Sequence, residues 1–501
     1  MKTKIWYLFL ISIFFQVSCS QSEKRPNILF IMADDHTSQA WGIYGGILKD
    51  FVKNENIERI ARNGAKLKNV FCTNSICVPS RASIMSGQYS HKNGVYTLRD
   101  SLDSTRDNIA RTLQSAGYRT ALFGKWHLKS KPTGFDEFTV LPGQGNYHNP
   151  YFKTLENWEK GEEGMIQKQG FSSDVITDMS LDWLSTQNSD EPFFLMCHFK
   201  ATHEPFDFAD RYRHLYDGVE FPEPESLDDW GAGTTKRSFP GHQIDILGER
   251  YEKASTGDFW TSYPELPFDT DGLDSIEARK KIYQKFIRDF LRSGAGIDDN
   301  IGRLLDYLED NGLDENTVVI YTSDQGYFLG EHAFFDKRMM LEESLRMPFI
   351  IQYPKEIPGG TEYDEMILNI DFPALFADYA EIDKPDYIQG ESFRDILSGE
   401  EVADWRDKMY YRYWTHSPTR PAHLGIRTGR YKLIYYYGKS IDGEGPIEDL
   451  KEPGWDFYDL EEDPAELNNA YDQSKYRKII ARLKSDLQKL KEETGDGDDP
   501  F

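Results

Sequence analysis

Residues 27–36 read Asn-Ile-Leu-Phe-Ile-Met-Ala-Asp-Asp-His, an apolar run that ends abruptly in two carboxylates. An uninterrupted apolar run of this length is typical of a parallel strand covered on both faces. The carboxyl ends of such strands line the crevice in which α/β proteins bind ligands. The stretch therefore predicts a central strand of an α/β sheet, with Asp34 and Asp35 at the binding edge.

Later apolar runs end in polar clusters in the same way. Residues 119–123 lead into Gly124-Lys125-Trp126-His127, residues 193–199 into Lys200-Ala201-Thr202-His203, and residues 318–321 into Thr322-Ser323-Asp324-Gln325-Gly326. Helical patterns lie between these strands, at residues 57–64, 108–117 and about 276–311. We therefore expect an α/β fold with a large, mostly parallel sheet sandwiched by helices, and we expect the polar clusters to converge beyond its strand ends.

The sequence changes character after about residue 382. Short aromatic runs separated by turns predict the strands of an antiparallel sheet, at residues 410–414, 425–428, 431–436 and 455–460. A charged amphipathic helix is expected from about residue 473 to residue 493. The predicted units are a large α/β domain over 25–382, a smaller C-terminal α+β domain over 383–494, and a tail over 495–501.

Residues 207–275 do not fit this pattern of strands and helices. The segment is rich in Gly, Pro, Asp and aromatic residues. Segments of this length without periodic structure are usually functional loops. We therefore expect a long insertion or an active-site loop.

The charge of the chain bounds its partners. The 501 residues include 58 basic and 84 acidic ones, which gives a formal charge of −26. A nucleic-acid binder would need a basic face that displaces phosphate counterions, so the composition argues against that class. A locally positive pocket for an anionic substrate stays compatible with it.

The first residues have the pattern of a targeting segment. Lys2 and Lys4 precede an apolar stretch over residues 5–15, which is too short to span a membrane but suits a signal peptide over residues 1–20. Cleavage before Cys19 would produce a lipoprotein, and cleavage after Ser20 an ordinary exported protein. Export follows from either, and membrane contact is expected only through such a lipid anchor.

Cys77 opens the run Cys77-Val78-Pro79-Ser80-Arg81. Proline suits the first position of a helix, and Arg81 returns to the face of Cys77 one turn later, so a helix is expected to begin here. Helix N-termini attract anions. The alternative is a buried structural cysteine, which is what we expect of Cys197 in its apolar run, and the four cysteines do not indicate a disulfide scaffold.

The polar clusters hold complementary sets of side chains. Asp34, Asp35, Asp324 and the amide of Gln325 offer hard oxygen ligands, which suit calcium or magnesium rather than zinc. The alternative is a solvated acidic rim. The cations and imidazoles would form a cage around a tetrahedral oxyanion, and they are Arg81, Lys125, His127, His203 and Lys337.

These residues resemble a known family. The run from Cys77 to Arg81, with residues 82–87 after it, resembles the signature of type I sulfatases, which are members of the alkaline phosphatase superfamily. Three further stretches look like other motifs of that family: Asp34-Asp35, Gly124 to His127, and Thr322 to His332. The resemblance extends from about residue 26 to residue 469.

The resemblance implies a nucleophile made from Cys77. A separate maturation enzyme would oxidise Cys77 to formylglycine, whose hydrated aldehyde attacks sulfur and later expels sulfate. It also implies that Asp34, Asp35, Asp324 and Gln325 bind one calcium ion together with the formylglycine oxygen, with magnesium as the alternative. Gln325 stands where many members carry asparagine, and either amide can bind a metal.

The resemblance also implies roles for the cations. Arg81 is similar to the arginine that steadies the hydrated aldehyde, and His127 to the base that triggers sulfate release. Lys125, His203 and Lys337 look like the sulfate clamp. His203 or Lys337 would protonate or stabilise the leaving oxygen.

The expected activity is hydrolysis of sulfate esters of a sulfated polysaccharide by an exported bacterial enzyme, in the periplasm or as an outer-membrane lipoprotein. Algal polysaccharides such as ulvan are slightly favoured. The alternatives are a heparan-type glycosaminoglycan sulfatase, a phosphoesterase or phosphonate hydrolase of the same superfamily, and a non-catalytic glycan-binding protein. Five residues are candidates for contacts with the sugar, and the alternative is that they are ordinary surface or core residues. They are His148, His332, Arg420, His423 and Arg427.

Overall fold

The computed structural model describes residues 24–52, 54–188, 191–229, 233, 243–416, 420–438 and 453–498. The predicted signal peptide, including Cys19, lies outside these residues. Within them, no helix has both the length and the apolar character that crossing a membrane requires.

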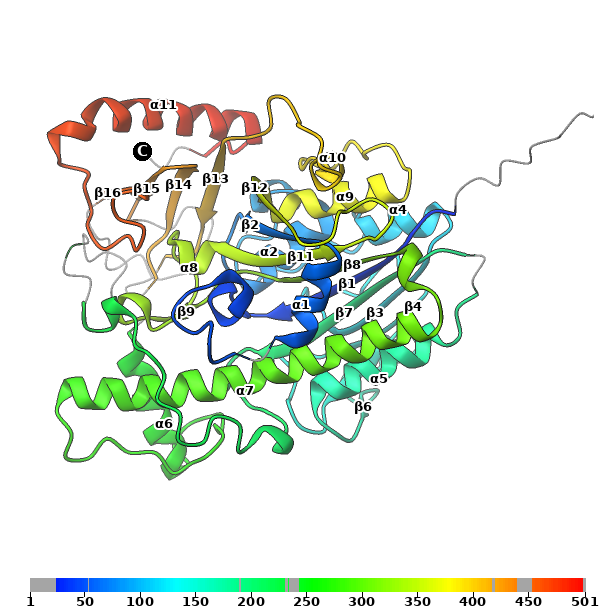
Figure 1. Ribbon diagram of the computed structural model, residues 1–501, viewed down its shortest axis with the longest axis horizontal. Coiled ribbons are helices and arrows are strands. Elements are labelled where there is room, and N and C mark those ends of the chain that lie inside the picture. The colour runs from blue at the N-terminus through cyan, green and yellow to red at the C-terminus, as the bar shows by residue number, and fades with distance from the viewer. Residues whose placement is uncertain are drawn as a thin grey trace, which may run out of the picture.

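A ten-stranded sheet forms the centre of the molecule (Figure 1). Its strand order is β12-β2-β11-β8-β1-β7-β3-β4-β5-β6. The strands are β1 (Asn27–Asp34), β2 (Ala65–Phe71), β3 (Arg119–Lys125), β4 (Glu137–Leu141), β5 (Tyr151–Thr154), β6 (Ile166–Gln167), β7 (Phe193–Thr202), β8 (Thr317–Ser323), β11 (Arg346–Gln352) and β12 (Thr361–Leu368). The run from β8 to β4 is parallel, whereas β11 lies antiparallel between β8 and β2. The prediction of a large, mostly parallel sheet is confirmed.

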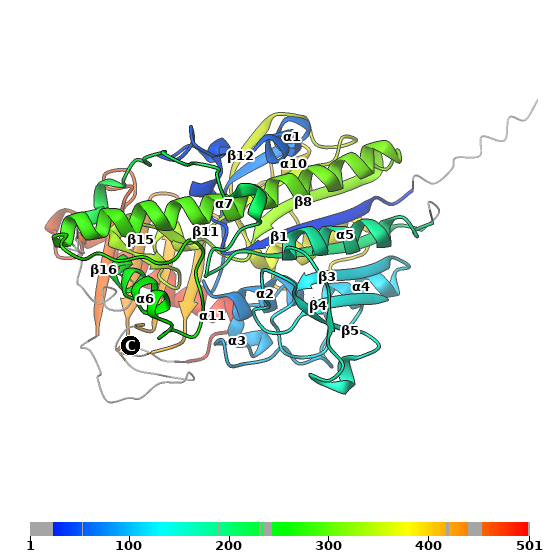
Figure 2. The same cartoon turned by 90° about the horizontal axis from the view of Figure 1, so that it is seen from below.

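Helices cover both faces of this sheet (Figures 1 and 2). One face carries α1 (Glu55–Asn63), α5 (Ser172–Leu184) and α7 (Ser275–Asp310), and the other carries α2 (Cys77–Ser86), α4 (Ile109–Ser115) and α9 (Phe372–Tyr379). Alternate residues of β1 enter the two cores: Leu29 packs on the α7 side and Phe30 meets the ring of Phe376 in α9. The continuous apolar pattern of β1 therefore reflects burial on both faces.

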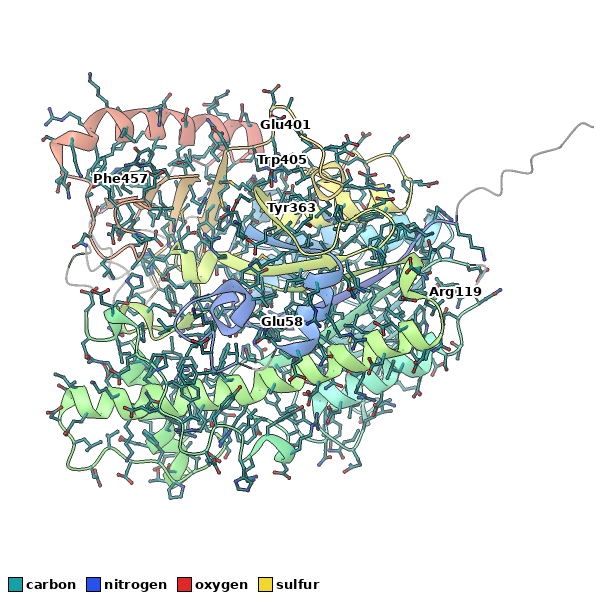
Figure 3. The ribbon with its side chains drawn as sticks, viewed as in Figure 1. Glu58, Arg119, Tyr363, Glu401, Trp405 and Phe457 are labelled. Atoms are coloured by element: carbon teal, nitrogen blue, oxygen red, sulfur yellow. The ribbon has the colours of Figure 1, made fainter. Side chains whose placement is uncertain are left out.

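A second, four-stranded antiparallel sheet forms the C-terminal part. Its strands are β13 (Lys408–Tyr413), β14 (His423–Thr428), β15 (Tyr431–Tyr436) and β16 (Gly454–Asp459), and α11 (Arg477–Thr494) covers it. Phe457, labelled beneath α11 in Figure 3, is fully buried against Tyr431 and Tyr476. The predicted tail is packed where it is described, because the buried Asp496 accepts a hydrogen bond from Arg412 at 2.7 Å.

Residues 207–275, which we expected to be a long insertion or an active-site loop, contain helical structure that the sequence patterns did not predict. They include α6 (Ile244–Thr256), which packs against α7 through the buried side chains of Leu247 and Tyr251. Ile244, Leu247 and Tyr251 recur at helical spacing, and the Gly and Pro residues around them obscured this pattern. Residues 230–232 and 234–242 of this segment lie outside the described part of the chain.

Five further α-helices and strands of the described chain are short. They are α3 (Ser90–Asn93), α8 (Glu342–Leu345), α10 (Arg394–Leu397), β9 (Phe328–Leu329) and β10 (Phe335–Asp336). Arg119 opens β3 and marks the edge at which the parallel strands begin, on the far side from the small sheet (Figure 3). The carboxyl ends of β1, β3, β7 and β8 therefore point toward the four-stranded sheet, which contacts the α2 region where Arg412 N donates to the Thr73 carbonyl oxygen at 3.2 Å.

Candidate active site

The polar clusters meet because their strands are neighbours. β1 lies between β7 and β8, and the register pairs Asp34 with Thr202 and Ala33 with Ser323. The strand ends thus bring together Asp34 and Asp35 after β1, His203 after β7 and Asp324 after β8. The backbone N–H of Asp35 donates to Asp324 Oδ1 at 3.1 Å, which joins two clusters that are far apart in the sequence.

Lys125 reaches this edge from β3, through a glycine. Gly124 has a φ of +101°, and a Cβ atom added there would lie 1.9 Å from the His198 carbonyl oxygen. Only glycine therefore allows β3 to approach β7 so closely before Lys125. The buried Lys125 ammonium donates to Asp34 Oδ2 and, at 2.5 Å, to Gln144 Oε1.

Cys77 is the first residue of α2, and its side chain faces the carboxylates. The helix starts at Cys77, with Pro79 at its third position rather than its first. Cys77 Sγ lies 4.0 Å from Asp35 Oδ1 and 3.9 Å from Gln325 Nε2. Burial raises the pKa of the Cys77 thiol, and the nearby carboxylates add to this effect against Lys337, so an unmodified thiol stays protonated at neutral pH.

The oxygen donors fit a divalent cation. Ligand atoms of Asp34, Cys77 and Asp324 lie within 4.8 Å of one another, as do those of Asp35, Cys77 and His203. Among the described residues, the buried Asp34 Oδ1 and Gln325 Oε1 have no hydrogen-bond partner. Burial raises the pKa of Asp35 to about 7 and that of Asp324 to about 6, whereas Asp34, although burial opposes its charge, has a pKa well below its usual value because of Lys125 and the other neighbouring cations.

Cationic side chains surround these carboxylates. Arg81 Nε donates to Asp324 Oδ2 at 2.8 Å and its NH1 to the Lys125 carbonyl oxygen, also at 2.8 Å. Lys337 Nζ lies 2.6 Å from Asp35 Oδ2, and His203 Nε2 lies 3.8 Å from the same oxygen. Arg81, Lys125, Lys337 and His203 of the predicted cage therefore lie around the same carboxylates. The positive charges of the two lysines and the arginine offset the negative charge of these carboxylates.

The two imidazoles of the cage are neutral. Burial lowers the pKa of His127 to about 2, with Lys125 as the next cause, and its Nδ1 has no hydrogen-bond partner among the described residues. His127 has a φ of 62°, a backbone conformation that residue spacing alone does not predict. Burial, and then Lys125, also lower the pKa of His203 well below its usual value. Each neutral ring therefore has one nitrogen without a proton, and this nitrogen can accept one.

The predicted sugar contacts do not gather in the same way. His148 is half-exposed, 3.2 Å from Asp207 Oδ2, and Arg420 NH2 lies 3.9 Å from Asp336 Oδ2 beside Lys337. His332, His423 and Arg427 are buried in the interior. His423 stacks on Tyr411, and the Arg427 guanidinium binds Glu342 through Nε and NH2, both at 3.0 Å, so these residues have structural surroundings rather than an open face.

Sequence reasoning did not single out several groups at this edge. Asp336 and Arg338 flank Lys337 with φ values of 76° and 97°, and Arg338 Nε donates to Asp336 Oδ2 at 2.9 Å. Gln144 and Tyr147 belong to the run Gly143-Gln144-Gly145-Asn146-Tyr147-His148, of which only His148 was predicted to contact the substrate. Tyr147 Oη donates to the His203 carbonyl oxygen at 2.5 Å. The glycine run was the available signal, whereas no sequence pattern predicts positive φ for Asp336 or Arg338.

The inserted segment supports the turn that carries His203. The Glu204 carboxylate accepts hydrogen bonds from Arg250 NH1, at 2.8 and 2.9 Å, and from Tyr263 Oη. The Glu204 carbonyl oxygen lies 2.8 Å from His203 Nδ1, so the imidazole can donate there and leave Nε2 toward Asp35. Residues 207–275 therefore contribute to the site by holding His203.

Comparison with protein families gives two matches. The family model described as sulfatase matches residues 26–382. The model described as the C-terminal part of N-sulphoglucosamine sulphohydrolase matches residues 330–493. The first match contains all the residues of the cage and the second includes the four-stranded sheet.

Individual proteins are similar over most of the chain. An N-acetylglucosamine-6-O-sulfatase of Bacteroides thetaiotaomicron is 38% identical, over 95% of this chain and 87% of that protein. An ulvan-active sulfatase of Formosa agariphila is 24% identical, over 94% of this chain and 82% of that protein. A solved structure in complex with its substrate D-glucosamine-2-N,6-O-disulfate has a TM-score of 0.86 and 35% identity, covering 95% of this chain and 99% of that one.

Proposed function

The chain belongs to the sulfatase family, and from this premise we propose that it hydrolyses the 6-O-sulfate of a glucosamine residue in a sulfated glycan. The protein is a sulfuric ester hydrolase that acts on sulfated glycans. The proposal of a glucosamine 6-O-sulfate as substrate rests on the 38% identity with an N-acetylglucosamine-6-O-sulfatase over 95% of this chain. Ulvan, which the sequence slightly favoured, has no specific support, because the ulvan-active relative is much less similar.

We assign the nucleophile to Cys77 after oxidation to formylglycine. The raised pKa of the buried thiol supports this, because an unmodified Cys77 has almost no thiolate at neutral pH. When formed, formylglycine supplies a hydrated aldehyde, with one hydroxyl to attack sulfur and a second to expel the sulfate. Cys77 begins α2, so the free N–H groups of the first turn favour the negative charge that develops beside it.

Asp34, Asp35, Asp324 and Gln325 would hold one divalent cation. Their oxygen donors favour calcium over softer metals, and the unpartnered Asp34 Oδ1 and Gln325 Oε1 are available for it. When bound, the cation supplies positive charge that makes the nucleophile more acidic and draws electrons from the sulfate. Arg81 then keeps Asp324 in place through its hydrogen bond at 2.8 Å.

The residues of the cage differ in protonation state, and therefore in the part that each takes in proton transfer. His127, neutral in its buried position, accepts the proton whose loss releases sulfate. Burial opposes the charge on Lys337, but Asp35 raises its pKa above the usual value, so Lys337 stays protonated. Lys337 therefore stabilises the charge on the leaving sugar oxygen, while His203 lies beside it with Nδ1 held by the Glu204 carbonyl oxygen.

The polar side chains next to Lys337 would contact the sugar. Asp336 and Arg338 lie on either side of it, and Arg420 approaches Asp336 from the C-terminal part of the chain. A carboxylate between guanidinium groups can accept hydrogen bonds from sugar hydroxyls while the guanidinium groups donate to them. We propose these residues, together with the half-exposed His148, in place of the buried His332, His423 and Arg427.

A substrate panel tests this proposal directly. The protein, produced together with a formylglycine-generating enzyme, is assayed on N-acetylglucosamine-6-sulfate, glucosamine-2-N,6-O-disulfate, ulvan oligosaccharides and an aryl phosphate. We expect the glucosamine 6-sulfates to give the highest kcat/KM. Faster turnover of ulvan oligosaccharides would refute the substrate, and faster turnover of the aryl phosphate would favour a phosphoesterase or phosphonate hydrolase instead.

We also propose that the protein is exported by a bacterium to the periplasm or to its outer membrane as a lipoprotein. The charged and apolar pattern of residues 1–20 supports this. Fractionation of cells that produce the full chain should find the protein outside the cytoplasm. A Cys19→Ser variant would leave the membrane fraction if Cys19 is lipidated, and a cytoplasmic full chain would refute export.

A further inference from the structure

Lys200 differs from the other buried lysines of the described chain. Six lysines are buried in these residues. Five of them contact an oxygen atom, namely Lys125 with Asp34, Lys285 with Asp289, Lys337 with Asp35, Lys432 with Glu342 and Lys491 with the Asp498 carbonyl group. Lys200 is 3% exposed, and its ammonium lies 4.6 Å from the centroid of the Tyr147 ring, with no ion pair or hydrogen bond to the described residues.

This arrangement is costly for the free protein. A buried ammonium loses its hydration, and an aromatic face returns only part of that free energy. Burial, and then the neighbouring Lys125, lower the pKa of Lys200 to about 7, although the more distant charges of Asp34 and Asp35 oppose this change. Lysines are almost never fully buried unless they are paired, which indicates that an anion from outside the chain completes this position.

Lys200 is part of the site edge. It lies near the end of β7, two residues after His198, whose Nδ1 is 3.1 Å from the Lys125 carbonyl oxygen. Its carbonyl oxygen accepts a hydrogen bond at 3.2 Å from the backbone N–H of His203. Tyr147, which holds the Lys200 ammonium on its ring, also donates to the His203 carbonyl oxygen. Lys200 and His203, one residue of the proposed sulfate clamp, are thus held by the same turn.

We propose that Lys200 is a substrate-binding residue whose ammonium binds an oxygen of a sulfo group. This rests on the proposed function, because it assumes a sulfated sugar in the site. The sulfo group has two sources: the ester sulfate that is hydrolysed, or a second sulfo group on the sugar, such as the 2-N-sulfo group of a disulfated glucosamine. Binding of either sulfo group would give the Lys200 ammonium an anionic partner in direct contact, which it does not have in the free protein.

The variant Lys200→Met removes the charge and keeps the length and volume of the side chain. Lys200→Arg keeps the charge, and Lys160→Met is the matched control, because Lys160 is exposed outside the site. Because the unpaired ammonium is costly in the free protein, Lys200→Met should keep or raise the thermal midpoint, and Lys160→Met should leave it unchanged. Each is assayed on N-acetylglucosamine-6-sulfate and on glucosamine-2-N,6-O-disulfate, and its inhibition constant for inorganic sulfate is measured.

We expect Lys200→Met to lose about tenfold or more in kcat/KM, equal to about 1.4 kcal/mol, through a higher KM, and Lys200→Arg to recover part of it. Equal losses on both sugars with weaker inhibition by inorganic sulfate would assign Lys200 to the hydrolysed ester. A loss confined to the disulfated sugar would assign it to the second sulfo group.

Two results would overturn the proposal. One is activity of Lys200→Met within about twofold of the unchanged protein on both sugars, with unchanged inhibition by sulfate. The other is a lower kcat with unchanged KM and sulfate inhibition and no recovery in Lys200→Arg, which would indicate a structural role. If the unchanged protein hydrolysed an aryl sulfate but neither sugar, the proposed substrate would fail, and inhibition by inorganic sulfate would still decide the role of Lys200.

Discussion

Two regions of the molecule bury charged side chains, and they treat them differently. In the C-terminal region, both oxygens of Glu342 are paired, with Arg427 at 3.0 Å and Lys432 at 2.9 Å. At the strand ends of the large sheet, buried polar atoms of Asp34, Arg81, His127 and Gln325 have no hydrogen-bond partner among the described residues. Atoms of Arg412, Lys432 and Glu466 in the C-terminal region also lack a hydrogen-bond partner among the described residues, so such atoms are not by themselves the difference. The difference is that those at the strand ends gather at one edge of the sheet with the carboxylates around Cys77, as expected of a site that a ligand completes.

The largest effect should follow from removing the proposed nucleophile. Cys77→Ala should lower kcat by about 10⁴-fold or more, because no neighbouring group can replace a covalent nucleophile. Its thermal midpoint should stay close to that of the unchanged protein, since Cys77 makes only long contacts, at 3.9 and 4.0 Å. Kinetics and thermal unfolding measure the two effects, and mass spectrometry of the Cys77 peptide should detect formylglycine. An active Cys77→Ala protein would contradict the assignment.

The paired region should respond in the opposite way. Arg427→Met leaves Glu342 short of a buried partner, so we expect a loss of about 3 kcal/mol in the free energy of unfolding. The specific activity of the folded protein should be unchanged, because Arg427 does not face the site. Arg430→Met is the matched control, since Arg430 is part-exposed beside Asp459 and should cost less than about 1 kcal/mol. Loss of activity without loss of stability would return Arg427 to the sugar contacts.

Removal of the divalent cation from the strand ends should affect both activity and stability. Chelation should abolish turnover and lower the thermal midpoint, because a ligand at 100 times its Kd stabilises the folded state by about 2.7 kcal/mol. Calcium should restore both properties, and a parallel addition of magnesium identifies the preferred ion. Asp324→Asn should reduce the shift in midpoint, since it removes a ligand charge. Full activity after exhaustive chelation would exclude the cation site.

The smallest effect concerns pH and the buried imidazole of the C-terminal sheet. Burial lowers the pKa of His423 to about 4, so between about pH 6.5 and pH 4 the unfolded chain binds a proton that the folded one does not. Stability therefore falls as the pH falls through this window, by about 2 kcal/mol at pH 5 for this group. His423→Gln should flatten the curve measured by denaturant unfolding, whereas the exposed control His214→Gln should not. An unchanged slope in His423→Gln would show that the ring is not protected.

Local sequence patterns predicted four central strands of the ten-stranded sheet and the centre of the site. The apolar runs of β1, β3, β7 and β8 correspond to strands, and Asp34, Lys125, His203 and Asp324 meet at their ends. The patterns failed for α6, whose helical spacing is short and surrounded by Gly and Pro. They also failed for Asp336 and Arg338, because positive φ at these residues depends on packing and not on propensity.

The amino-acid sequence by itself determined the alternation of strands and helices, the start of a helix at Cys77 and the types of side chain at each strand end. These follow from periodicity and chain geometry over a few residues. Only the tertiary structure decided which charges are paired: Arg427 meets Glu342, 85 positions away in the sequence, whereas the Lys200 ammonium lies over an aromatic ring. The reason is that a charge interacts with whatever the fold brings near it, so its partner depends on long-range packing that no local pattern specifies.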